Sequence, residues 1–174
     1  MRACAAQQQL VTHQLKTLDQ DRADLFTAEP ELARKLAHLT SIPGIGLTTA
    51  IVVLAETNGF VLVENERQLT SYAGLDVVQR QSELPAPATR ISQRGNVRLR
   101  TAIYLPAGSS LRYNPQQMAF YARLRARQPS GKPGVIAVMC KLLVRCFSLW
   151  KNECAYDPHY HPAHVAEKEV APTI

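Results

Sequence analysis

The segment from Leu39 to Ala50, LTSIPGIGLTTA, constrains the fold of this chain more than any other stretch. Pro43 cannot continue a helix, because its ring removes a backbone hydrogen-bond donor and collides with the preceding turn. Gly44 and Gly46 give the backbone access to left-handed or closely packed conformations that other residues avoid. The sequence therefore predicts a helix that ends before Pro43, a tight turn, and a second helix over residues 47–56.

This predicted turn allows two interpretations. It resembles the hairpin of helix-hairpin-helix proteins, which grips the DNA backbone, and the N–H groups at the start of its second helix would favour a phosphate. Gly44 and Gly46 are then candidate nucleic-acid-binding residues. The alternative is a glycine-rich corner that holds two core helices together. The turn by itself does not decide between these interpretations.

The N-terminal 37 residues predict a long helix that is broken near Pro30. Its apolar positions follow a heptad-like spacing, with Arg22 in the one gap; they are Val11, Leu15, Leu18 and Leu25. Such a coiled-coil-like seam needs a partner that buries it, either a second copy of the chain or another part of the same protein. A homo-oligomer formed through this helix is therefore expected.

Most of the remaining chain also carries helix signals, so the predicted fold class is mainly α. Asn65, Asn96 and Asn114 are plausible N-caps, Gly74 a C-terminal cap, and the last helix runs from about Pro133 to Glu153. A short β-hairpin is possible near 76–92. The expected organisation is a coiled-coil-like segment over 1–37, a helical domain over 38–157 and a disordered tail over 158–174.

The composition supports a protein with its own core and no membrane segment. Apolar residues make up 46% of the chain, and no run of 18 of them exists. The N-terminus lacks the apolar core of a signal peptide, so we expect a cytoplasmic protein. The four cysteines have no spacing typical of a metal site or a disulfide. His159, His161 and His164 of the tail could bind a metal, but the alternative, a chance cluster in a disordered tail, is favoured. No metal or cofactor is therefore expected in this chain.

The positive charge is concentrated in the middle of the sequence. Residues 79–132 contain nine arginines and one lysine but one acidic residue, Glu83, whereas residues 40–78 carry a net negative charge. A short basic run is usually a solvated face, but an arginine-rich block of this length favours a nucleic-acid partner.

Several motifs occur in an order that resembles one family. They are SIPGIG (41–46), YAGL (72–75), QS (81–82), ISQRGNVRLR (91–100), the stretch from Asn114-Pro115 to Leu124, GK (131–132) and KLL (141–143). Over about residues 36–158 the chain looks like the C-terminal half of insertion-sequence transposases of the IS110, IS116 and IS902 type.

The resemblance implies a two-part, RNA-guided serine recombinase for DNA transposition. Its N-terminal domain, of the ribonuclease H type, would bind divalent metal through four acidic residues, and a coiled coil would join it to a helical domain that carries a serine nucleophile. Multimers of such proteins use a structured guide RNA to pair donor and target DNA. The present chain begins just before the coiled coil and offers no cluster of acidic residues for a two-metal site.

The family's serine corresponds to Ser82, which is the candidate catalytic residue. Its hydroxyl would attack a DNA phosphate, and nearby cations would stabilise the added negative charge. The candidate nucleic-acid-binding residues, besides the two glycines of the turn, are Arg80, Arg90, Arg94, Asn96, Arg98, Arg100 and Lys132. The alternative is that Ser82 is an ordinary loop serine.

Two departures from the family pattern bear on activity. Glu83 stands where a glycine usually follows the serine, and its carboxylate would repel the scissile phosphate. Pro106 lies in a predicted helix that should kink there. Together with the absent acidic domain, they suggest a truncated transposase that is inactive alone. The rival hypotheses are a non-catalytic helix-hairpin-helix DNA-binding module with an oligomerising helix, and a structural helical protein without DNA affinity.

Overall fold

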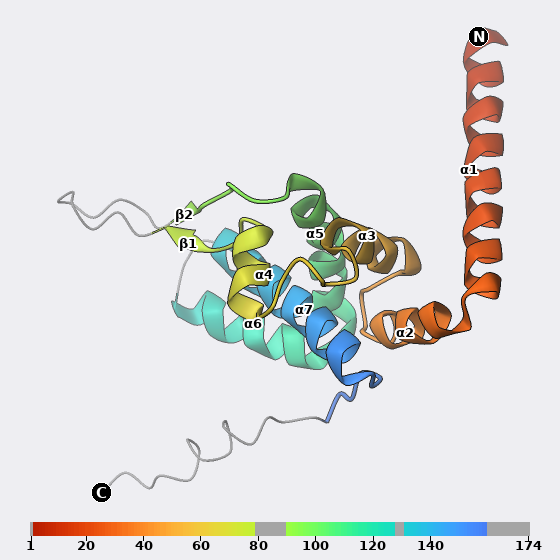
Figure 1. Ribbon diagram of the computed structural model, residues 1–174. Helices are drawn as coiled ribbons and strands as arrows, with labels where there is room; N and C mark the ends of the chain where they lie inside the picture. Colours follow the sequence, from red (N-terminus) through yellow and green to blue (C-terminus); the bar gives the residue numbers. More distant parts are fainter. Residues whose placement is uncertain (1, 79–89, 128–130, 160–174) are drawn as a thin grey trace, which may run out of the picture. The chain divides into compact units, whose positions relative to one another are not determined.

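The chain divides into two compact units, Met1–Ala37 and His38–Ile174, which we describe separately. The computed structural model describes residues 2–78, 90–127 and 131–159, and Figure 1 traces them. The segment with Arg80, Ser82 and Glu83 and the tail beyond residue 159 lie outside the described residues.

The N-terminal unit is built around α1 (Arg2–Ala28), a helix of 27 residues. Glu29 separates it from α2 (Pro30–Thr40), which begins with the proline, so the predicted break near Pro30 is confirmed. The apolar side chains Leu10, Val11, Leu15 and Leu18 are each 48–57% exposed. The seam is thus exposed at Val11, Leu15 and Leu18, and its pairing with a second copy stays a prediction.

The turn after α2 has the expected helix on each side. α3 (Leu47–Thr57) begins directly after Gly46, and Gly44 has φ +102°. A Cβ atom at Gly44 would lie 3.0 Å from the carbonyl oxygen of Pro106 and from Cβ of Ser110. Gly44 therefore brings the turn against the helix that contains Pro106, whereas a helix-hairpin-helix role in DNA binding stays a prediction.

The C-terminal unit is a helical body, as the predicted mainly α class requires. Its further helices are α4 (Glu66–Tyr72), α5 (Val97–Tyr113), α6 (Pro115–Arg127) and α7 (Lys132–Asn152). α7 contacts α4, α5 and α6, and α5 also contacts α3 and α6 (Figure 1). Fully buried side chains from these elements include Val53, Leu69, Leu99, Ile103 and Leu142.

The apolar character of α7 follows from its place in this body. By length and composition α7 would be long enough to cross a membrane. It packs against three other helices and buries Val138, Leu142, Leu143 and Cys146, which are all 0% exposed. We therefore assign α7 as the central core helix of the unit.

The predicted helix caps are confirmed. The side-chain oxygens of Asn65 and Asn96 accept hydrogen bonds from the backbone N–H groups of Gln68 (2.9 Å) and Leu99 (3.0 Å). Asn114 caps α6 in the same way. Gln68 reaches back to the N–H of Glu64, one residue before the position expected for a capping box.

Pro106 does not end its helix. α5 runs from Val97 to Tyr113 with the proline inside it, and Pro106 is buried. The predicted kink stays a prediction. The backbone carbonyl of Pro106 lies close to Gly44, so this part of α5 packs against the turn between α2 and α3.

A two-stranded antiparallel pair interrupts the helices. β1 (Val77–Val78) pairs with β2 (Arg90–Ile91), with Val77 opposite Ile91 and Val78 opposite Arg90. This agrees with the short hairpin expected near 76–92. The pair brings the two ends of the intervening segment to one place on the body.

Candidate nucleic-acid interface

Two glycines cross at the base of the strand pair, and we call this crossing the glycine junction. Gly74, with φ +67°, ends the turn after α4, and Gly95 precedes α5. A Cβ atom at Gly95 would lie 2.2 Å from the nitrogen of Gly74 and from the carbonyl oxygen of Tyr72. Such distances leave no space for a side chain, so the YAGL motif (72–75) and the ISQRGNVRLR motif (91–100) meet backbone to backbone.

Hydrogen bonds close the glycine junction on the side of the strands. The N–H of Gln93 donates to the carbonyl of Gly74 (3.1 Å), and that of Ser92 donates to the carbonyl of Asp76 (2.9 Å). The Ser92 hydroxyl also donates to the Asp76 carboxylate, at 2.5 Å. The chain that enters residues 79–89 and the chain that leaves them are thereby held together.

A polar network centred on Glu56 ties the junction to α3. The side-chain amide of Asn96 donates to the Glu56 carboxylate (2.8 Å), and the Tyr72 hydroxyl donates to the Glu56 backbone carbonyl (2.9 Å). The guanidinium of Arg98 lies 3.5 Å from the other carboxylate oxygen. Asn96 thus caps α5 and joins three helices through one side chain.

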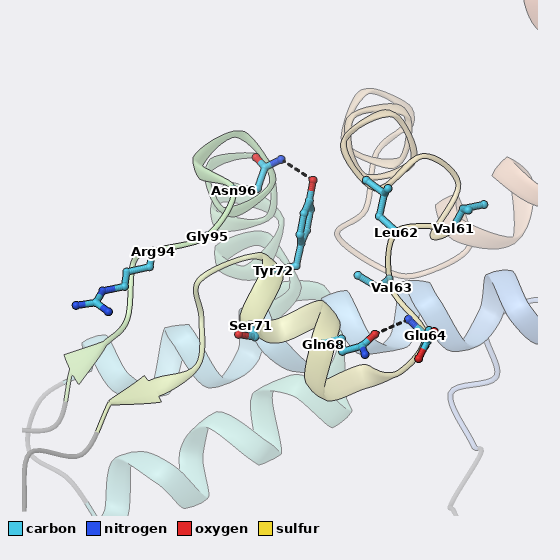
Figure 2. A pocket seen from close by; sticks show the side chains of 10 residues that line it. All are labelled: Val61, Leu62, Val63, Glu64, Gln68, Ser71, Tyr72, Arg94, Gly95 and Asn96. Carbon is cyan, nitrogen blue, oxygen red and sulfur yellow. Dashed lines mark hydrogen bonds between the residues drawn. The ribbon is translucent and has the colours of Figure 1, made fainter.

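An open cavity of about 810 Å³ lies beside the glycine junction (Figure 2). Its lining combines an apolar edge, Val61 to Val63, with polar groups of α4 and of the segment before α5. Figure 2 shows Tyr72 and Asn96 facing each other and Arg94 extending away from them. We call this the junction cavity. Its polar lining residues are Glu64, Gln68, Ser71, Tyr72, Arg94 and Asn96.

The structure separates the predicted arginines into different environments. Arg94 and Arg98 are exposed, and the Arg98 side chain, although paired with Glu56, is 83% exposed. Arg100 is partly buried and donates from Nη1 to the carbonyl of Ala73 (2.8 Å). Its guanidinium therefore supports the turn after α4 as well as adding positive charge.

The remaining predicted residues that the structure describes belong to different elements. Lys132 is exposed at the first position of α7. Gly46 is exposed at the N-cap of α3, where a Cβ would meet nothing within 4 Å. Arg90 lies in β2, while Arg80 and Ser82 fall outside the described residues. The assignment of these residues to DNA contact and catalysis stays a prediction.

A second concentration of positive charge lies on α6 and α7, which sequence reasoning did not single out. Burial lowers the pKa of Lys141, and the neighbouring charges of Arg145 and Arg123 lower it further. The Lys141 ammonium lies 4.3 Å from the centre of the Phe120 ring. The four-residue spacing of Lys141 and Arg145 indicates in the sequence that they share one helix face. Nothing in the sequence indicates that Arg123 of α6 lies near them.

Within residues 2–78, 90–127 and 131–159, no three His, Cys, Asp or Glu side chains gather as a metal site requires. The two cysteines of α7 are at least partly buried, whereas Cys154 is exposed. Burial raises the pKa of Cys146 to about 12 and also raises that of Cys140.

Comparison with known proteins places these features in one family. Residues 36–122, half of the chain, match the sequence profile of the Transposase IS116/IS110/IS902 family. The chain belongs to this family. The matched residues run from the end of α2 into α6 and include the turn, the glycine junction and the lining of the junction cavity.

Named relatives agree with this assignment. The chain is 31% identical over 150 residues to the pilin gene-inverting protein of Moraxella lacunata, covering 83% of this chain and 45% of the relative. It is 38% identical over 76 residues to the transposase for insertion sequence element IS1111A of Coxiella burnetii, covering 44% and 21%. The chain thus spans less than half the length of these relatives.

Proposed function

We propose that this chain supplies the DNA-binding and serine-nucleophile part of a recombinase that moves or inverts DNA. Membership of the transposase family and the similarity to a pilin gene-inverting protein support this proposal. The observation that carries it is the pairing of Val78 with Arg90, the described residues on either side of the segment that includes Ser82, and Arg90 lies only four positions before the exposed Arg94.

The proposed reaction is a phosphoryl transfer to Ser82. The serine oxygen forms a bond to a DNA phosphorus, one phosphodiester P–O bond breaks, and the serine proton leaves to a base while the departing DNA hydroxyl gains one. Arg94 and Arg98 are suited to hold the phosphate, because a guanidinium donates to two phosphate oxygens at once. Their exposure would allow a DNA backbone to reach them.

Other parts of the proposed assembly lie beyond the chain itself. Divalent metal would be held by a separate acidic domain, and a structured guide RNA would select the DNA partners. Multimers would form through the apolar seam of α1, whose residues Val11, Leu15 and Leu18 are exposed. A cytoplasmic location is expected for a recombinase that acts on chromosomal DNA.

A binding experiment tests DNA contact. Fluorescence anisotropy with a labelled duplex should give an affinity that falls as salt rises, because phosphate contacts release counterions. Replacing Arg94 and Arg98 by Gln should lower the slope of log K against log salt by about 1.8, at about 0.9 per lost contact. Arg112→Gln, an exposed change at the far end of α5, is the matched control.

A covalent assay tests the nucleophile. When the chain is joined to an intact acidic domain of a family member, labelled DNA should form an adduct with the protein that survives denaturing electrophoresis and disappears in Ser82→Ala. If Glu83 repels the scissile phosphate, Glu83→Gly should increase the yield of adduct. DNA binding without an adduct in either protein would instead support a non-catalytic DNA-binding module, and no salt-dependent binding at all would leave a structural protein.

A further inference from the structure

A second cavity, of about 760 Å³, lies between β2, α5 and the start of α7. Its lining is mostly apolar and includes Ile91, Val135, Ile136 and Met139. We call it the apolar cavity. This volume falls within the range typical of small-ligand pockets, roughly 300–1,000 Å³.

One aromatic ring stands out in the lining of the apolar cavity. Tyr104 lies on α5 and is 58% exposed, although it borders an apolar hollow. A tyrosine offers a large flat surface with little conformational entropy to lose, so an exposed ring beside a hollow is a ready stacking surface.

Cations from two distant parts of the sequence flank the same hollow. Arg100 reaches it from α5 and Lys132 from the first turn of α7, and the described residues that line it include no carboxylate. Both cations were candidate nucleic-acid-binding residues on sequence grounds. An apolar interior with a positive border matches a ligand that has a flat, weakly polar part and an attached anion.

We propose that the apolar cavity receives a single unstacked base of a DNA strand, which stacks on Tyr104 while Lys132 and Arg100 hold the adjoining phosphate. This inference rests on the proposed function. It specifies which part of the DNA is recognised, namely a single unstacked nucleotide. A paired base cannot enter, because its faces are covered by its neighbours and its edge by its partner. The cavity therefore favours DNA with an unpaired nucleotide over a continuous duplex.

The test uses two fluorescent DNA probes with 2-aminopurine at the same position. In one probe this base is unpaired in a bulge, and in the other it is paired in a continuous duplex. The protein should quench the bulged base and bind that probe more tightly. Tyr104→Ala should weaken binding to the bulged probe by about 5- to 100-fold and leave the duplex affinity unchanged.

Matched variants separate stacking from general effects on the fold. Tyr104→Phe keeps the ring and should retain the preference for the bulge. Tyr113→Ala removes a ring that is 70% exposed at the end of α5 but does not line the cavity, and should change neither probe. Lys132→Gln should lower the salt dependence for the bulged probe by about 0.7 in slope.

The outcomes distinguish this assignment from the proposed function. If the duplex binds but Tyr104→Ala leaves both quenching and affinity for the bulge unchanged, the apolar cavity is not a base site. A bulged RNA probe of the same sequence serves as a third ligand. If Tyr104→Ala weakens binding to the bulged RNA but not to the bulged DNA, the assignment to DNA is wrong. If the unaltered protein binds neither DNA probe, the proposed function itself fails.

Discussion

The turn after α2 and the glycine junction both depend on pairs of glycines, but the pairs act differently. At the junction, Gly74 and Gly95 each face backbone atoms that a Cβ would approach within 2.6 Å or less. In the turn, a Cβ at Gly44 would lie 3.0 Å from α5, whereas one at Gly46 would meet open space. A glycine motif in sequence therefore does not show whether the backbone is packed or exposed.

This difference matters for the assignment of DNA contacts. The junction has both glycines committed to the fold, and its accessible groups are the side chains around it, such as Arg94. In the turn, Gly44 supports the fold through its contact with α5, and Gly46 remains exposed at the start of α3. If the turn touches a phosphate, Gly46 and the following N–H groups are the part that can do so.

Gly95→Ala should have the largest effect on stability. The added methyl would overlap backbone atoms of Gly74 and Tyr72, which cannot rotate away, so we expect a loss of more than about 3 kcal/mol in the free energy of unfolding. Urea denaturation followed by circular dichroism measures this loss.

Alkylation at pH 8 gives a second measure of the same change. Cys146 is buried and its raised pKa keeps it protonated, so iodoacetamide should modify Cys4 and Cys154 but spare it in the folded protein. Gly95→Ala should expose Cys146 to the reagent. If Gly95→Ala kept native-like stability and a protected Cys146, the backbone at the glycine junction would be able to shift and accept a methyl group without loss of stability.

Gly44→Ala should be the next most damaging change, with a loss of about 1–3 kcal/mol. Alanine is strained at φ +102°, and its methyl would press on Pro106 and Ser110. The melting temperature measures the effect, and Gly108→Ala is a control at a helical glycine with no atom near its Cβ position. Equal behaviour of the two variants would contradict a packed role for the turn.

Asn96→Ala should cost about 1–2 kcal/mol, because α5 loses its cap and Glu56 loses a hydrogen bond. Asn65→Ala removes the cap of α4 at an exposed position and should cost less. Chemical denaturation of the two variants side by side checks the order. A larger loss for Asn65→Ala would mean that the Glu56 network adds nothing to stability.

Gly46→Ser should have the smallest effect and the opposite sign. Gly46 has extended backbone angles, has no side chain to cap α3 and faces open space, so a serine hydroxyl can cap the helix and stabilise it by a few tenths of a kcal/mol. A shift in melting temperature of about 1–2 °C is expected. A clear loss of stability would show that Gly46 is as constrained as Gly44.

The local elements were predictable because their signals are local. Asn65, Asn96 and Asn114 cap the helices that follow them, and Pro30 starts a helix, since each signal acts within one helical turn. The mainly α class, the break near Pro30 and the short strand pair follow from the same kind of information. The family was also evident, because its motifs keep their order along the chain.

What the tertiary structure decided is which distant residues meet. Nothing in the spacing of the motifs shows that Gly95 presses on Gly74, that Arg100 supports the carbonyl of Ala73, or that Tyr104 and Lys132 border one hollow. These contacts depend on how α4, α5 and α7 pack, which is set by the buried faces of several helices at once. The sequence by itself determined the elements and the family, whereas packing determined which glycine is buried, which arginine is exposed and where a ligand has room.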